Sequence, residues 1–129
     1  MPLKPYLVLP IPFSPTLRTR FLSVALAAIP RLAGDAFARA ILDGVADGRR
    51  VVAFFGADTE EPGTVDLYVM LADDAANRLA AGRTRIDGDR FPSLTPRCPQ
   101  VHLFEREIAE QFGLRPDGHP WLKPVRYRR

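Results

Sequence analysis

The sequence predicts an α+β fold, in which helices pack on one face of a small, mostly antiparallel sheet and are followed by a C-terminal helix and a Gly-His-Pro turn. Apolar residues recur at helical spacing in three segments, and β-branched and aromatic residues cluster in short runs between them. A stretch rich in turn formers separates two of these runs, which favours a hairpin. With 129 residues, 47% of them apolar, the chain suits a single domain over residues 1–129 with a real core.

The first part of the chain is expected to supply one edge strand and two helices. Residues 6–9 are the candidate edge strand within a proline-rich lead. Residues 16–29 form a first expected helix, which Pro30 should end. A second helix is expected over residues 35–48, with Asp35 as its cap. Both helices carry an apolar stripe, so we expect them to cover a sheet.

Residues 50–56 and 64–71 are the clearest strand candidates, because both runs are β-branched and aromatic. The turn-forming segment 58–63 between them indicates a hairpin. Residues 74–82 are ambiguous, since their alanine-rich composition also permits a short capped helix. Residues 87–89 then read as a turn.

Most of the functional signal lies in residues 101–120. Val101, Phe104, Ile108 and Phe112 recur at the spacing of one helix face. Gly113 stands where a left-handed C-terminal cap is expected. The sequence therefore predicts an amphipathic helix that ends at a glycine stop.

A tight turn is predicted directly after that helix. Pro116 prevents the helix from resuming, and Gly118 permits a sharp change of direction. Pro120 favours an extended backbone at His119. A turn histidine of this kind acts as a proton relay or, more commonly, bonds to backbone or to a partner.

The charges of the predicted helix can be placed by angle, at about 100° per residue. Glu105 borders the apolar face, Arg106 points to the opposite side, and Glu107 lies beside Glu110. Glu105 and Glu107 are about 200° apart, so they cannot flank one bond as an acid–base pair. Arg106 and Glu110 lie one turn apart, which allows a weak surface ion pair. A solvated charged face over a core-packing stripe explains this spacing equally well.

Composition argues against several kinds of site. The single cysteine, Cys98, cannot form an internal disulfide or hold an iron–sulfur cluster or zinc alone, and two histidines, His102 and His119, do not change this. We therefore expect no metal and no cofactor in this domain, and an inert Cys98. Low cysteine content fits a reducing, cytoplasmic setting. The longest nearly apolar stretch, residues 21–29, falls far short of the roughly 20 residues that span a bilayer, so membrane association would come through a partner.

Charge is concentrated at the C-terminal end, where residues 115–129 hold five Lys/Arg and one Asp. A basic end that contains Trp121 and Tyr127 is compatible with a small, basic-tailed nucleic-acid-binding domain. Without a basic helix or stripe elsewhere, a docking tail is the better interpretation, and no nucleic-acid partner is expected. Trp121, a large aromatic residue in a proline-rich tail, is the strongest candidate for an interface anchor.

The order of several short motifs between residues 92 and 120 resembles a known family. They are Pro-Ser-Leu-Thr at 92–95, Glu105-Arg106-Glu107, Glu110, Phe112-Gly113-Leu114 and Gly118-His119-Pro120. This order resembles the thirty-kilodalton (C-type) subunit family of complex I, the NADH:quinone oxidoreductases. It is equally similar to the N-terminal module of the large subunit in hydrogenase-4-type [NiFe] hydrogenases. The resemblance implies a strand over residues 78–86, paired with the preceding strand.

Three departures favour the hydrogenase-4-type module. Ala109 stands where the family often has an aromatic residue, and Gln111 where it usually has a hydrophobic one. After the His-Pro pair, Trp121-Leu-Lys-Pro replaces the usual leucine and arginine pair. Since the hydrogenase module continues directly into the large-subunit domain, residues 1–129 are either a separate subunit or the N-terminal part of a longer chain.

The resemblance implies a non-catalytic assembly domain that holds no cofactor. Such a domain docks on a large subunit of the forty-nine-kilodalton type or of the hydrogenase type, in cis or in trans, beside other subunits of the hydrophilic arm. It would be cytoplasmic and peripheral to the inner membrane through its partners. Arg106 is expected to be the most exposed charge of the docking surface. The signature residues expected to form or brace that surface are Glu105, Arg106, Glu107, Glu110, Gly113, Gly118, His119, Pro120 and Trp121.

Overall fold

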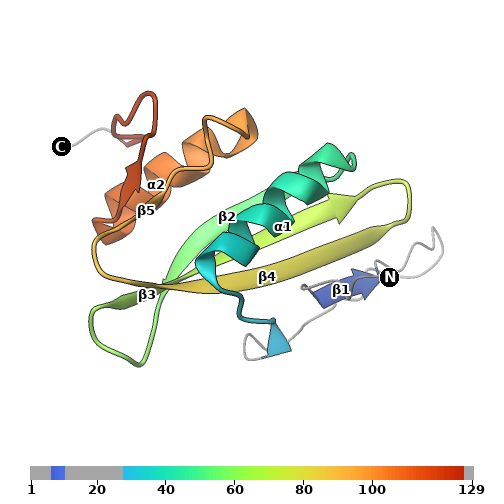
Figure 1. Cartoon of the computed structure of the whole chain (residues 1–129), viewed down its shortest axis with the longest axis horizontal. Coiled ribbons are helices and arrows are strands. Elements are labelled where there is room, and N and C mark those ends of the chain that lie inside the picture. Colours follow the sequence, from blue (N-terminus) through green and yellow to red (C-terminus); the bar gives the residue numbers. More distant parts are fainter. Residues whose placement is uncertain (1–6, 11–27, 127–129) are drawn as a thin grey trace.

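The structure is a computed structural model that describes residues 7–10 and 28–126 (Figure 1). Its α+β architecture confirms the fold class that the sequence predicts. The elements in chain order are β1 (Leu7–Pro10), α1 (Gly34–Ala46), β2 (Arg50–Asp58), β3 (Thr64–Asp73), β4 (Arg78–Asp87), β5 (Arg90–Pro92), the short 3₁₀ helix η2 (Pro99–Val101), α2 (His102–Phe112) and β6 (Arg115–Asp117).

The main sheet is antiparallel throughout, in the order β1-β4-β3-β2. The predicted hairpin joins β2 to β3, and the predicted edge strand is present as β1. β3 and β4 pair from Thr64 opposite Asp87 to Asp73 opposite Arg78. The helix alternative for residues 74–82 is therefore wrong. Pairing along ten residues of β4, with Ala80 and Ala81 buried, outweighs the helical propensity of the alanines.

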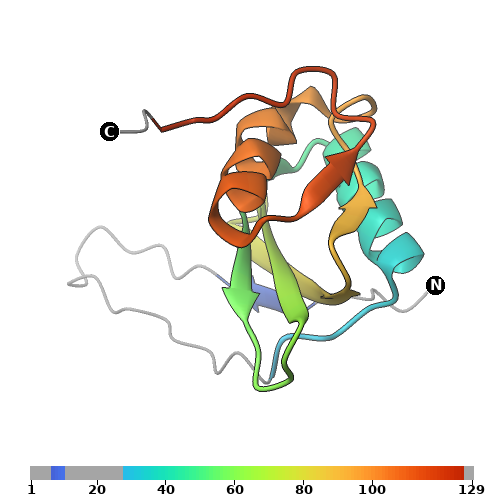
Figure 2. The same cartoon turned by 90° about the vertical axis from the view of Figure 1, so that its left-hand side faces the viewer.

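A second, two-stranded sheet was not predicted. β5 and β6 run parallel, with Phe91 opposite Pro116. Both of these residues are buried. Strands of three residues carry too little periodicity to be recognised from sequence. Figure 2 shows the β5–β6 pair between α2 and α1 in that view.

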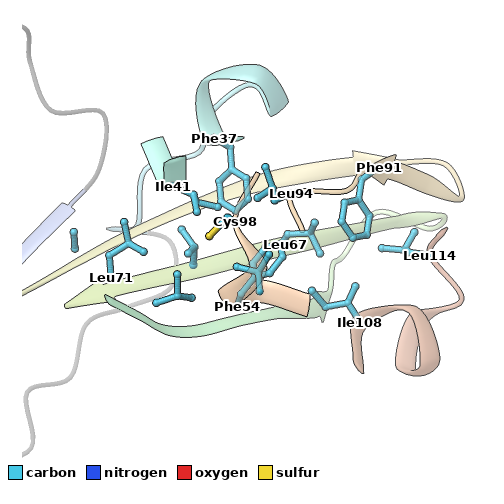
Figure 3. Close-up of a cluster of buried hydrophobic side chains, with 14 residues drawn as sticks. Phe37, Ile41, Phe54, Leu67, Leu71, Phe91, Leu94, Cys98, Ile108 and Leu114 are labelled. Atoms are coloured by element: carbon cyan, nitrogen blue, oxygen red, sulfur yellow. The ribbon is translucent and has the colours of Figure 1, made fainter. Parts of the chain in front are cut away.

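Both helices contribute to a single core on one face of the main sheet. Alternation along β2 and β3 directs one set of side chains into this core and leaves Phe55 and Tyr68 to stack with each other on the opposite face. Figure 3 shows the core side chains converging from α1, the sheet, the segment after β5 and α2. Among the members of this cluster are Phe37, Ile41, Phe54, Leu67, Leu71, Phe91, Leu94, Cys98, Val101, Ile108 and Leu114.

The end of α2 lies very close to β2. A Cβ atom placed on Gly56 would come within 2.6 Å of the Phe112 ring. Real Cβ atoms do not approach other side chains this closely, so the glycine permits the packing of α2 on the sheet. The predicted apolar stripe is confirmed, because Val101 and Ile108 are buried and Phe104 and Phe112 pack against the core.

The predicted ends of the helices are confirmed in part. Gly113 adopts the left-handed conformation with φ 68°, as predicted for the cap of α2. Asp35 is not the cap of α1, because the N-cap residue is Ala33, which has no side chain that could bond. Asp35 lies one residue into the helix, where its charge complements the helix dipole. Most of the helix predicted over residues 16–29 lies outside the described residues.

Candidate functional site

Glu105 is fully buried, with an exposed fraction of 0%. Its carboxylate accepts hydrogen bonds from Ser93 Oγ at 2.6 Å, from the Leu94 amide at 2.9 Å, and from the Thr95 amide at 3.2 Å and hydroxyl. The charge is thus stabilised by several donors from one loop. Glu105 therefore ties α2 to the segment that follows β5, and it is not itself exposed.

Arg106 is also buried, at 8% exposure, so the prediction that it is the most exposed charge is wrong. The chain after β6 returns over α2 and covers it. Nε of Arg106 donates to the Lys123 carbonyl at 2.7 Å, and Nη2 donates to the Pro124 carbonyl at 3.1 Å. The forked guanidinium can satisfy both carbonyls at once. The angular positions of residues on α2 could not predict this burial, because they contain no information about the chain that returns over the helix.

The two remaining glutamates of α2 hold the same returning segment. Glu110 accepts hydrogen bonds from the Val125 amide at 2.9 Å and the Arg126 amide at 3.2 Å. Glu107 forms an ion pair with Arg126. The expected Arg106–Glu110 ion pair is replaced by these contacts, since each of the two residues bonds the returning backbone. We call residues 119–126 the strap.

The turn that begins the strap is held by its histidine. Gly118 has φ 86°, in the left-handed region that the predicted sharp turn requires. His119 Nε2 lies 3.1 Å from the His102 carbonyl at the start of α2, and Nδ1 accepts a hydrogen bond from the Trp121 amide at 3.1 Å. Of the two roles expected for a turn histidine, these contacts correspond to bonding of backbone. Pro120 joins His119 to Trp121.

The strap presents apolar side chains to solvent. Trp121, Leu122 and Val125 are 56%, 44% and 40% exposed, and we call these three residues the strap patch. The Trp121 ring lies 4.9 Å from the Arg106 guanidinium and 5.0 Å from the Lys123 ammonium. Such distances permit cation–π attraction to both cations. Trp121 is therefore exposed yet held in place.

Sequence reasoning identified Trp121 but missed the rest of the patch and the partners of Glu105. Leu122 and Val125 stand in a segment without periodicity, so only the path of the strap reveals their exposure. Ser93 and Thr95 could have been found, because they are hydrogen-bonding residues within a motif that the family resemblance already includes.

The signature carboxylates do not converge on a reaction centre. Glu105 bonds the loop at 93–95, whereas Glu107 and Glu110 bond the strap. Burial raises the pKa of the Cys98 thiol, and the Glu105 charge raises it further. A protonated, buried thiol is a poor nucleophile. In the described part of the chain, no three His, Cys, Asp or Glu residues gather in a way that could hold a metal.

A cavity of about 480 Å³ opens elsewhere, between α1 and the segment around β5. Its walls are largely apolar and include Phe37, Leu42, Phe91 and Leu94. The signature residues do not line it. Of the motifs that carry the resemblance, only the segment 92–95 reaches this cavity, through Pro92 and Leu94.

The basic side chains at positions 115, 123 and 126 each have a partner within the chain. Among the described residues after 114, Arg115 pairs with Asp117 at 3.6 Å, Arg126 pairs with Glu107, and Lys123 lies against Trp121. A nucleic-acid-binding surface needs cations that can reach phosphates. These contacts weaken the nucleic-acid alternative.

The model of one protein family, described as "Respiratory-chain NADH dehydrogenase, 30 Kd subunit", matches residues 35–127. The chain belongs to this family. The match begins in the first turn of α1 and includes β2 to β6 and the strap, so every signature residue lies within it. Membership confirms the complex I part of the resemblance.

A short match to a curated protein agrees with this assignment. The chain is 46% identical over 33 residues to the C/D subunit of the NADH-quinone oxidoreductase of Methylococcus capsulatus. The match covers 26% of the chain but only 6% of that protein. Separately, none of the helices within the described ranges is long and apolar enough to cross a membrane.

Proposed function

We propose that the chain is a non-catalytic docking domain of a complex I-like NADH:quinone oxidoreductase or a membrane-bound hydrogenase. In this role it stabilises the hydrophilic arm beside a large subunit. The observation that carries the proposal is the strap patch, three exposed apolar side chains on a segment that α2 holds in place. Membership of a subunit family supports the existence of such partners.

The strap suits docking for two physical reasons. Covering the exposed part of Trp121 would contribute roughly 2–3 kcal/mol, from the area of a tryptophan side chain and the usual value per unit of apolar area. The bonds from Arg106 and Glu110 fix the backbone of the strap before binding. A preorganised segment loses less conformational freedom on binding, so more of the contact energy appears as affinity.

We further propose that the partner is a large subunit of the hydrogenase-4 type. The departures at Ala109, Gln111 and the segment after Pro120 favour a hydrogenase-4-type large subunit over a forty-nine-kilodalton-type one. We propose that this domain contributes no cofactor, and that its cytoplasmic, membrane-peripheral position is set by its partners. The partner is joined in cis or in trans. An immunoblot of source cells under denaturing conditions distinguishes these cases, because a fused chain gives a band much larger than this domain.

The test of docking is co-purification of the large subunit with tagged chain. Trp121→Ser removes the most exposed side chain of the strap patch, and we expect it to lower recovery of the large subunit by more than about tenfold, the factor that corresponds to 1.4 kcal/mol. Phe55→Ser is the matched control, since Phe55 is also an exposed aromatic residue, at 41%, but lies on β2. Unchanged recovery with Trp121→Ser, or equal losses with both variants, would contradict docking through the strap. In a fused chain, the same comparison is made by limited proteolysis of the intact protein.

A further inference from the structure

We propose that His119 is a positioning residue for Trp121, and that it acts only in its neutral form with the proton on Nε2. Uptake of a second proton at Nδ1 would release the start of the strap. The presentation of Trp121 would thus depend on pH. The consequence for docking rests on the proposed function, whereas the release itself is a property of this chain alone.

The two partners of His119 fix its tautomer. A backbone amide can only donate, so the Trp121 amide requires Nδ1 to be an unprotonated acceptor. A backbone carbonyl can only accept, so the His102 carbonyl requires the proton on Nε2. The neutral Nε2–H imidazole satisfies both bonds at once. The imidazolium form cannot, because its Nδ1–H would face the N–H of Trp121.

Among the described residues, the carboxylates near this turn are paired with groups other than the His119 ring. On α2, Arg106 lies against the Trp121 ring, Glu105 bonds the loop at 93–95, and Glu107 and Glu110 bond the far end of the strap, at residues 125 and 126. On β6, Asp117 is within 4 Å of two arginines, Arg90 and Arg115. On the strap itself, Lys123 brings a further positive charge to the ring of Trp121. His102 contributes its carbonyl, and its own ring is the second imidazole at this end of α2.

The direction of the pH effect follows from these contacts. The closed turn binds the neutral imidazole, so the open form takes up one more proton. Protonation of the imidazole therefore disfavours the closed form, and deprotonation favours it. Loss of one hydrogen bond corresponds to about a fivefold change in the ratio of open to closed forms. Repulsion between the two N–H groups adds to this change.

Trp121 is the only tryptophan in the chain, so its fluorescence reports on the turn directly. We would titrate the full chain from about pH 8 to about pH 5, a window centred on imidazole, and follow the emission maximum and quenching by acrylamide. We expect a single transition in that window, towards red-shifted emission and stronger quenching, with unchanged far-ultraviolet circular dichroism. A flat titration would overturn the proposal.

Two variants assign the transition to one ring. His119→Asn places an amide oxygen near the position of Nδ1, which can still accept from the Trp121 amide but cannot titrate in this range. We expect this variant to remove the transition. His102→Gln is the matched control, because it removes the other imidazole of the chain while leaving the carbonyl that bonds His119. A transition that persists in His119→Asn, or disappears in His102→Gln, would refute the assignment to His119.

A spectroscopic readout separates positioning from mere structural support. Nitrogen–proton correlation spectra of the imidazoles should show the Nε2–H tautomer for His119 near about pH 8 and the doubly protonated form near about pH 5. An Nδ1–H tautomer at the higher pH would also overturn the proposal. No partner is present in these experiments, so a negative result here would not contradict docking through the strap. Failure of co-purification likewise leaves the fluorescence transition intact.

Discussion

α1 and α2 cover the same face of the sheet, but they do so with different chemistry. The buried residues of α1 are Phe37, Ile41 and Gly44, all without charge. The buried residues of α2 include Glu105 and Arg106 as well as Ile108. The buried part of α1 therefore stabilises the domain through apolar packing. α2 also binds segments on two sides, the loop at 93–95 and the strap.

The largest expected effect concerns the buried carboxylate of α2. Glu105→Ala would leave the donors of residues 93–95 buried without an acceptor, so we expect a loss of about 3–5 kcal/mol in the free energy of unfolding. Urea denaturation measures it. Ile41→Val in α1 is the comparison, with an expected loss of about 0.5–1.5 kcal/mol. If the two losses were equal, the distinction between the helices would not hold.

A smaller effect is expected on the strap side of α2. Arg106→Lys keeps the charge but loses the fork that reaches the Lys123 and Pro124 carbonyls together. We expect faster amide hydrogen exchange at the backbone of residues 119–126, with global stability lowered by about 1 kcal/mol or less. Ile41→Val should lower global stability without exposing the strap. Equal exchange in wild type and Arg106→Lys would show that the strap is held by other contacts.

At neutral pH no effect on ionisation is expected from Cys98 in the core, and its contribution changes only in alkaline solution. Because burial raises the pKa of its thiol, the folded state keeps the proton at a pH where the unfolded chain loses it, above about 8.5. Stability from this residue is therefore present below that pH and falls as the pH rises. The difference in unfolding free energy between wild type and Cys98→Ala should shrink by at most about 1.4 kcal/mol per pH unit there. A constant difference would mean that the thiol ionises equally in both states.

The sequence predicted more of the fold than of the site. The stripe through Ile108, the glycine stop at Gly113 and the hairpin after β2 are local patterns, and the structure confirms them. The prediction that Asp35 caps α1 was wrong, because a helix can begin without a side-chain cap. α1 begins at Gly34, one residue before Asp35. The prediction that Arg106 is exposed was wrong for a different reason. The strap residues that bond its side chain are 17 and 18 positions away in the sequence.

Within the sequence itself, periodicity and turn chemistry determined the fold class, and an ordered set of motifs indicated a family that residues 35–127 then matched. These features depend on residues a few positions apart, so they can be read along the chain. Only the tertiary structure decided which charges are buried, and that Trp121, Leu122 and Val125 are exposed on a segment bound to α2. Burial depends on segments that return from elsewhere in the chain, and the spacing of residues on one helix carries no information about them.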